Sequence, residues 1–83
     1  MSQATATRLS EEDVRSALRE VVNSDVVQAW DLEFDFAEDA LDSLDKATFA
    51  LFLEENYQFV LSDEELAGVH SIADVLRLSA TRN

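Results

Sequence analysis

The tetrapeptide Asp42-Ser43-Leu44-Asp45 is the part of this sequence best suited to carry chemistry. A short polar residue followed three positions later by an acid is typical of a helix start, and a strongly apolar run follows directly. If Asp42 is the N-cap, Ser43 is the first helical residue, and its hydroxyl lies beside backbone N–H groups that lack a helical acceptor. The helix dipole would favour a phosphate attached there, although the flanking carboxylates oppose it. Ser43 is therefore the candidate modification site, and a plain capping segment is the alternative.

Other residue types that could support chemistry form no complete site. His70 is the only histidine and the chain has no cysteine, which excludes thiolate zinc sites and thiol nucleophiles. Alternating acids from Asp31 onward resemble the start of a calcium loop. An EF-hand requires Gly at its sixth position and Glu at its twelfth, where this chain has Phe36 and Asp42. We expect no metal site, and a divergent calcium-binding module is the weakest alternative.

The composition and charge of the chain limit both the class of protein to which it can belong and the kind of partner it can bind. The chain has 83 residues, 18 acidic and 6 basic side chains, and a formal net charge of -12. A chain of this length forms one small domain, and its charge repels nucleic acids and anionic membranes while attracting basic protein surfaces. From Asp31 to Glu65, 12 acids accompany a single base, Lys46. No apolar run reaches the ~20 residues of a membrane span. We expect a cytoplasmic monomer that docks onto basic proteins.

The elements that must position Ser43 follow from the same capping pattern, which occurs at Ser10, Asp42, Ser62 and Ser71. Each is followed by apolar residues at helical spacing, which predicts helices over about 10–23 and 42–57, a short helix from 62 and a last helix from 71. Residues 24–41 form a long connection held by aromatic side chains. The alternation at 32–36 also fits an edge strand, but an ordered loop is favoured because no second strand is present to pair with it.

The predicted fold is therefore all-α: a small four-helix bundle of three main helices and one short helix, with a long loop between the first and second. We place a flexible leader at 1–9, the folded domain at 10–79 and a flexible tail at 80–83. Trp30 and Phe34 are expected to hold the long loop against the core, and a partner surface is the alternative for these two residues. His70 is expected at a helix junction.

Four motifs follow one another between about 39 and 78, roughly half of the chain. They are Asp42-Ser43-Leu44-Asp45, then Leu53-Glu54-Glu55-Asn56-Tyr57, then Leu61-Ser62-Asp63-Glu64-Glu65, and finally Val69-His70-Ser71-Ile72-Ala73-Asp74-Val75. With these motifs the chain resembles the acyl carrier protein family, and the match is ungapped over this range. Asp-Ser-Leu alone is a weak signal, whereas the ordered set at these spacings is a strong one.

The resemblance implies a carrier, not an enzyme. A phosphopantetheinyl transferase would attach phosphopantetheine to Ser43, and the terminal thiol of that arm would hold acyl groups as thioesters. The sulfur would belong to the cofactor, which agrees with the absence of cysteine. The partners would be acyl-loading and acyl-processing enzymes with basic docking surfaces, steered by charge and set in register by an apolar patch. The docking residues on this chain would be Asp42, Leu44, Asp45, Ala47 and Leu51.

The sequence departs from the family pattern in three respects. Ala40 replaces the glycine that usually lies three residues before the serine, and Thr48 replaces the acid that usually lies five residues after it. Aromatic bulk also surrounds the central helix, at Phe49, Phe52, Tyr57 and Phe59. These departures favour a specialised carrier of a short, polar or aryl acyl group, in a fatty-acid, polyketide or other secondary-metabolite pathway. An acidic helical adaptor that is never modified is the alternative of a different class.

Overall fold

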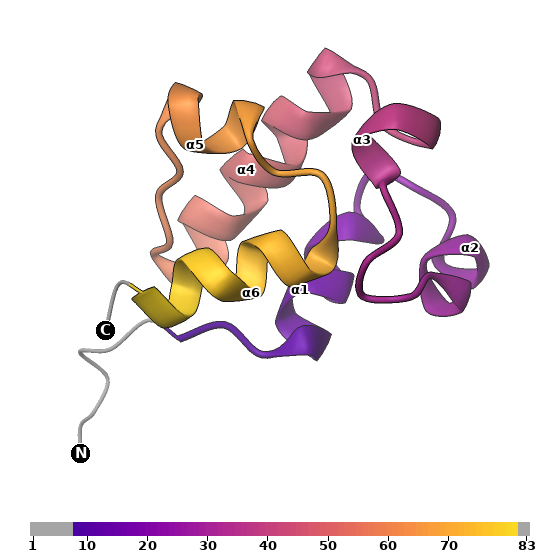
Figure 1. Ribbon diagram of the computed structural model, residues 1–83, viewed down its shortest axis with the longest axis horizontal. Coiled ribbons are helices and arrows are strands. Elements are labelled where there is room, and N and C mark those ends of the chain that lie inside the picture. Colours follow the sequence, from indigo (N-terminus) through magenta and orange to yellow (C-terminus); the bar gives the residue numbers. More distant parts are fainter. Residues whose placement is uncertain (1–7, 82–83) are drawn as a thin grey trace.

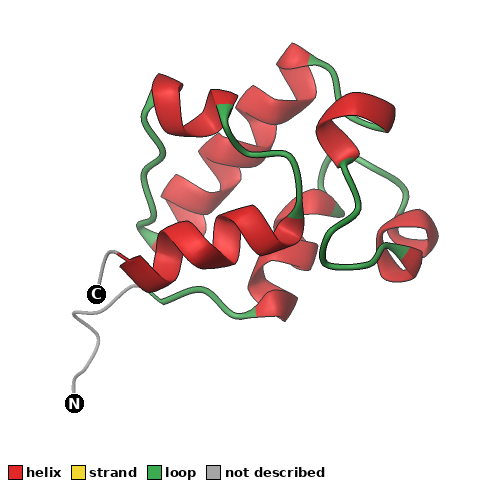
Figure 2. Ribbon diagram, in the orientation of Figure 1, coloured by secondary structure: helices red, strands yellow, loops and turns green. Residues whose placement is uncertain are grey.

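Helices are the only regular elements in residues 8–81, the part of the chain that the computed structural model describes (Figures 1 and 2). The all-α prediction is thus confirmed for this part of the chain, and the edge-strand alternative at 32–36 is wrong. No helix within this part is both long and apolar enough to cross a bilayer. The elements are α1 (Glu11–Leu18), α2 (Ser24–Ala29), α3 (Phe36–Asp39), α4 (Ser43–Tyr57), α5 (Asp63–Ala67) and α6 (Ile72–Thr81).

The four predicted helix starts are confirmed, because each is capped by the side chain that the pattern indicated. Ser10, Asp42 and Ser62 each form a reciprocal capping box with the acid three residues later. At α6, Ser71 Oγ accepts a hydrogen bond from the backbone N–H of Asp74 at 3.2 Å. The carboxylate of Asp74 accepts instead from the N–H of His70, at 2.9 Å. This contact places His70 at the junction of α5 and α6, as expected.

Helix α1 lies against α6, α4 and α2 and joins them into one core. In Figure 1, α4 and α6 are the longest ribbons, and α2 and α3 lie together at the opposite side of the domain from α5. The buried core draws on all three long helices and on the segments between them. Its members are Leu9, Val14, Ala17, Leu18, Val27, Trp30, Phe36, Leu41, Phe49, Leu53, Phe59, Val69, Ile72 and Val75.

The connection between α1 and α4 differs from the predicted loop. Helix α1 ends at Leu18 and not near 23, and residues 24–41 contain the two short helices α2 and α3. Side chains cap both of them: Asn23 Oδ1 accepts from the N–H of Asp25 at 2.8 Å, and Asp35 Oδ1 accepts from that of Glu38 at 2.9 Å. Helices of six and four residues are too short to show a clear apolar period.

Aromatic stacking and backbone hydrogen bonds hold this connection to the core. Trp30 is buried and stacks on Phe34 and Phe36, with ring centroids 5.0 and 5.8 Å apart, which confirms the expected role of Trp30 and Phe34. The N–H of Phe36 donates to the carbonyl of His70 at 2.9 Å, and that of Ala73 donates to the carbonyl of Leu32 at the same distance. The start of α6 is therefore bonded to the connection.

The boundaries of the domain lie slightly outside the predicted ones. Leu9, which we assigned to the leader, is buried, and its N–H donates to Ser79 Oγ of α6 at 2.6 Å. Helix α6 continues to Thr81, two residues past the predicted end of the domain. The rest of the predicted leader and tail, apart from Arg8, lies outside the described residues.

Helix α4 ends in a backbone conformation that suits glycine better than the residue present. Gln58, just after Tyr57, has φ 57° and ψ 29° in the left-handed region, where a side chain costs about 1 kcal/mol. We expect Gln58→Gly to raise the free energy of unfolding by roughly 0.5–1 kcal/mol, measured by urea titration. Asn56→Gly, within the helix, is the matched control and should destabilise. A loss of stability in Gln58→Gly would contradict this assignment of the helix end.

Candidate functional site

Ser43 is the first residue of α4, as the capping pattern predicted. Its side chain is exposed, and its hydroxyl forms no hydrogen bond with any other residue in the described range 8–81. Asp42, not Ser43, is the cap: its Oδ1 accepts from the N–H of Asp45 at 2.9 Å, and Asp45 Oδ2 accepts from the N–H of Asp42 at 3.5 Å. The structure therefore leaves the hydroxyl of Ser43 free to react.

Removing the cap should disturb both stability and the presentation of Ser43. We expect Asp42→Ala to lower the free energy of unfolding by about 1 kcal/mol, because the N–H of Asp45 loses its acceptor. Thermal unfolding and the rate of Ser43 modification measure the two effects. Ser62→Ala removes the equivalent cap of α5 and is the matched control, expected to cost a similar amount of stability and to leave the start of α4 intact. An unchanged melting temperature in Asp42→Ala would contradict the capping role.

Ser43 opens onto a groove between the start of α4 and the neighbouring helix α5. The groove has a volume of about 350 Å³ and is lined by Ser43, Lys46, Asp63, Leu66 and Ala67; we call it the Ser43 groove. Leu66 and Ala67 give it apolar surface, whereas Lys46 and Asp63 provide a cation and an anion. Such a lining suits an extended chain that carries both polar and apolar groups.

The docking residues named from the sequence lie around the same helix start. Leu44, Ala47 and Leu51 follow one another at i, i+3 and i+7, and all three are exposed, Leu44 by 74% and Leu51 by 52%. We call these three residues the α4 stripe. Asp42 is exposed and Asp45 is half-buried, and both carboxylates also serve the helix cap. The structure thus presents a free serine hydroxyl at one end of an apolar stripe.

The electrostatic surroundings of the stripe are strongly negative. Glu54 and Glu55 are exposed near the other end of α4, and none of the ion pairs found in residues 8–81 involves a carboxylate of this helix. Arg15 of α1, Arg19 just after α1 and Arg77 of α6 are paired elsewhere. Their partners are Glu11, Glu12, Glu33 and Asp74. The acids of α4 therefore form no ion pair within residues 8–81.

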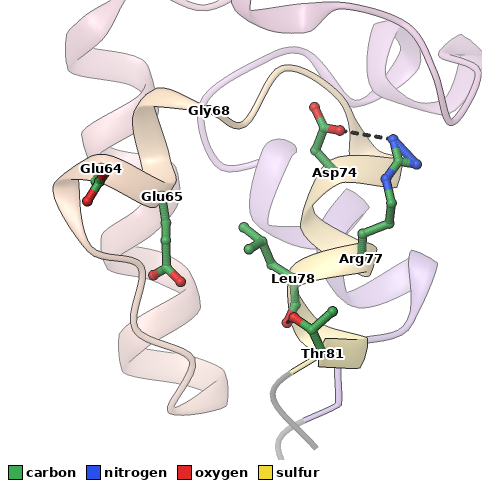
Figure 3. Close-up of a pocket in the computed structure, with 7 residues that line it drawn as sticks. All are labelled: Glu64, Glu65, Gly68, Asp74, Arg77, Leu78 and Thr81. Atoms are coloured by element: carbon green, nitrogen blue, oxygen red, sulfur yellow. Dashed lines mark hydrogen bonds and ion pairs between the residues drawn. The ribbon is translucent and has the colours of Figure 1, made fainter.

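A second groove lies between α5 and α6 and has a volume of about 360 Å³ (Figure 3). Leu78 forms part of its lining, and Asp74 and Arg77 form an ion pair along α6. Thr81 is the hydroxyl-bearing residue of this lining, and its Oγ1 donates to the carbonyl of Leu78 at 2.9 Å. Because that hydroxyl is already bonded, this groove offers no counterpart of Ser43.

Two of the departures from the family pattern cause no strain. Ala40 has φ −129°, which any residue adopts, so glycine is not needed at this turn. Thr48 is exposed on α4 next to the α4 stripe, and its hydroxyl donates to the carbonyl of Leu44 at 3.1 Å. The surface of α4 is therefore uncharged at position 48.

The third departure fills the interior with aromatic side chains. Phe36, Phe49 and Phe59 are fully buried, and the rings of Phe36 and Phe49 meet edge to face at a centroid distance of 6.1 Å. Phe52 and Tyr57, both half-buried, form another ring pair at 6.2 Å. The aromatic residues noted in the sequence thus contribute to the packing around α4.

The remaining candidate residues lie apart from the groove. His70 is not among the residues that line it, and the His70 Nδ1 lies 3.6 Å from Asp35 Oδ1. Two of the alternating acids have other contacts. Asp35 caps α3, and Glu33 Oε1 forms an ion pair with Arg77 Nη2 at 3.7 Å. No group of three acidic or histidine side chains within residues 8–81 is arranged to hold a metal ion. The calcium-loop alternative therefore has no ligand cluster in the described part.

The structure adds residues that the sequence reading did not connect to Ser43. Lys46, Asp63, Leu66 and Ala67 share its groove. Of these four residues, only Lys46 could have been connected to Ser43 from the sequence, because residues three apart on a helix are neighbours. Asp63, Leu66 and Ala67 reach the groove through the packing of α5. The arguments for function rest on these residues, because comparison with models of protein families, with curated proteins and with solved structures gives no match for this chain.

Proposed function

We propose that this protein is an acyl carrier protein that receives phosphopantetheine on Ser43 and presents acyl groups to partner enzymes. One observation carries the proposal: Ser43 has a free, exposed hydroxyl that lies both in the Ser43 groove and at the end of the α4 stripe. A carrier requires an accessible attachment point, a place for the arm and a docking surface on the same side of the molecule. The resemblance in sequence supplies the chemical identity of the arm.

The residues around Ser43 fit this group. Phosphopantetheine carries a phosphate at one end and amides along an extended chain, and the groove combines a cation, a carboxylate and apolar surface. When bound, the group supplies a thiol on which acyl groups are held as thioesters. The protein would contribute the Ser43 hydroxyl, whose oxygen forms the new bond to phosphorus as the pyrophosphate bond of coenzyme A breaks. Adenosine 3′,5′-bisphosphate is the leaving group, and the hydroxyl proton passes to the transferase. In this proposal the chain performs no catalysis itself.

The proposed architecture assigns each helix a task. Helices α1, α4 and α6 with the short α5 form the four-helix carrier bundle, and the segment that contains α2 and α3 is its long connection. The rings of Phe36, Phe49 and Phe59 are fully buried in the core around α4, and this aromatic packing supports a short, polar or aryl acyl group. We propose a cytoplasmic monomer that serves a specialised fatty-acid, polyketide or other secondary-metabolite pathway.

Modification by a phosphopantetheinyl transferase tests the proposal directly. The purified protein is incubated with a transferase of broad specificity and coenzyme A, and the intact mass is measured. We expect the mass to rise by one phosphopantetheinyl group, with fragment spectra that assign it to Ser43. An unmodified chain that still binds basic partners through the α4 stripe would support the adaptor alternative instead.

The acidic surface predicts opposite effects of salt on docking and on folding. Screening weakens the attraction to a basic partner and also the repulsion among the acids of this chain. Between low and moderate ionic strength we expect the rate of Ser43 modification to fall and the melting temperature to rise. Both are measured on the same preparations, and a transferase assay with a peptide substrate of low charge controls for effects on the enzyme. A rate of Ser43 modification that does not change with salt would exclude a docking role for the acids.

A further inference from the structure

Lys46 occupies an unusual place on this acidic protein. It is the only lysine of the chain and the only base from Asp31 to Glu65. It belongs to α4, three residues after Ser43, so the two side chains are neighbours on the helix surface. Both line the Ser43 groove. The one cation of this acidic stretch therefore lies beside the candidate modification site.

No carboxylate within residues 8–81 pairs with this ammonium group. The helical neighbours of Lys46 are Asp42, Ser43, Phe49 and Ala50, and the only acid among them uses its carboxylate to cap the helix. Asp63 lines the same groove but is not within ion-pair distance of Lys46. By contrast, the arginines of α1 and α6 are all paired. The ammonium group is thus free to pair with an anion that is added to the groove.

We infer that Lys46 is the counter-ion of the phosphodiester formed on Ser43, and that this contact directs the arm into the Ser43 groove. The inference rests on the proposed function and names a positioning residue for the same site. Lys46 makes no bond and transfers no proton in the modification. A lysine suits this task because its compact charge and flexible stem adapt to a phosphate from several directions.

The charges of the groove also indicate how the arm lies. The phosphodiester is anionic and is attracted to Lys46, whereas Asp63 repels it from the part of the groove formed by α5. The amide portion of the arm is uncharged and is not repelled by Asp63, so it would lie against Asp63, Leu66 and Ala67. Without Lys46, Asp63 would be the only charged side chain that lines the groove, and the arm would leave the groove more often.

Selective labelling of amines tests the counter-ion role. The thiol of the arm is first capped by alkylation. Because Lys46 is the only lysine, a limiting acylating reagent then labels the amines of Lys46 and of the α-amino group of the chain, which serves as the internal reference. We expect Lys46 to react roughly two- to fivefold more slowly in the phosphopantetheinylated protein than in the unmodified one, as for an exposed ion pair. High salt should remove the difference.

Nuclear magnetic resonance tests the directing role on the same samples. In the wild-type protein, modification should shift the backbone amide resonances of Asp63, Leu66 and Ala67. In Lys46→Gln these shifts should shrink by about half or more, whereas Lys46→Arg, which keeps the charge, should retain them. All samples are modified to completion, as judged by intact mass, so a slower transferase reaction does not affect the comparison.

The outcomes separate this inference from the proposed function. A complete mass gain with unchanged labelling of Lys46, or with equal resonance shifts in the wild type and Lys46→Gln, overturns the inference alone. The absence of any mass gain overturns the proposed function and the inference together. Slower labelling combined with charge-dependent shifts supports both.

Discussion

Ser43→Ala should abolish phosphopantetheinylation and all carrier activity while leaving the fold unchanged. The hydroxyl of Ser43 is exposed and has no hydrogen-bond partner among the described residues, so its removal should change the free energy of unfolding by less than about 0.5 kcal/mol. Alanine is also a good helix former at this exposed position. Intact mass after transferase treatment and thermal unfolding measure the two parts of the prediction.

Ser79→Ala is the matched control for Ser43→Ala. Ser79 is fully buried, and its Oγ accepts from the N–H of Leu9, so this variant should lose stability by about 1–3 kcal/mol and still be modified when folded. The contrast between the two serines separates a functional hydroxyl from a structural one. Unfolding of Ser43→Ala would show that Ser43 is structural, and modification that persists in this variant would assign the group to another residue.

Replacement of Arg15 should cause a large loss of stability. The Arg15 guanidinium is only 12% exposed and donates to the carbonyls of Val27 at 2.7 Å and Trp30 at 2.9 Å. These carbonyls lie at the end of α2, which has no basic residue in its last turn. Arg15 therefore caps a helix that is remote in sequence and supplies the positive charge that its C-terminus favours.

We expect Arg15→Gln to lower the free energy of unfolding by about 3 kcal/mol, because two charged hydrogen bonds are lost and two partly buried carbonyls lose their donor. In a domain of this size the melting temperature should fall by roughly 15 °C. Arg77→Gln is the control: its side chain is 61% exposed, so its ion pairs should contribute less than about 1 kcal/mol. Equal small losses in both variants would contradict the capping of α2 by Arg15.

Arg15→Lys refines the same prediction. A lysine keeps the charge but lacks the planar fork that reaches two carbonyls at once, so it should recover only part of the lost stability. Hydrogen exchange would then show faster exchange of the amides of α2 than of those of α4, because α2 loses its terminal contact first. Full recovery with lysine would mean that charge alone matters at this position.

The helix starts could be read from the sequence because they depend on local contacts. Ser10, Asp42, Ser62 and Ser71 each accept a hydrogen bond from the backbone N–H three residues later, and such contacts need no tertiary structure. The position of Ser43 at the head of α4 follows from the same local rule. The capping signal at Asp35-Phe36-Ala37-Glu38 has the same form and would have indicated α3, but no periodic apolar run follows it.

Helix α2 could not be predicted from local contacts, because residues outside the helix supply its stability. Its six residues hold few internal hydrogen bonds, and an isolated helix of that length is unstable in water. The guanidinium of Arg15 and the burial of Val27 and Trp30 stabilise it in the folded protein. The sequence of α2 alone does not indicate this cap, because the Arg15 side chain that supplies it lies twelve to fifteen residues from the carbonyls it binds.

The sequence by itself thus determined the helical class, the four main helix starts, the acidic character and the place of Ser43 at the head of α4. Only the tertiary structure decided that Asp63, Leu66 and Ala67 share a groove with Ser43, and that Leu44 and Leu51 remain exposed while Phe49 and Leu53 are buried. Helix α4 is apolar on several faces, so its periodicity does not tell which side meets the core. That choice depends on the packing of the neighbouring helices, which is a property of the whole chain.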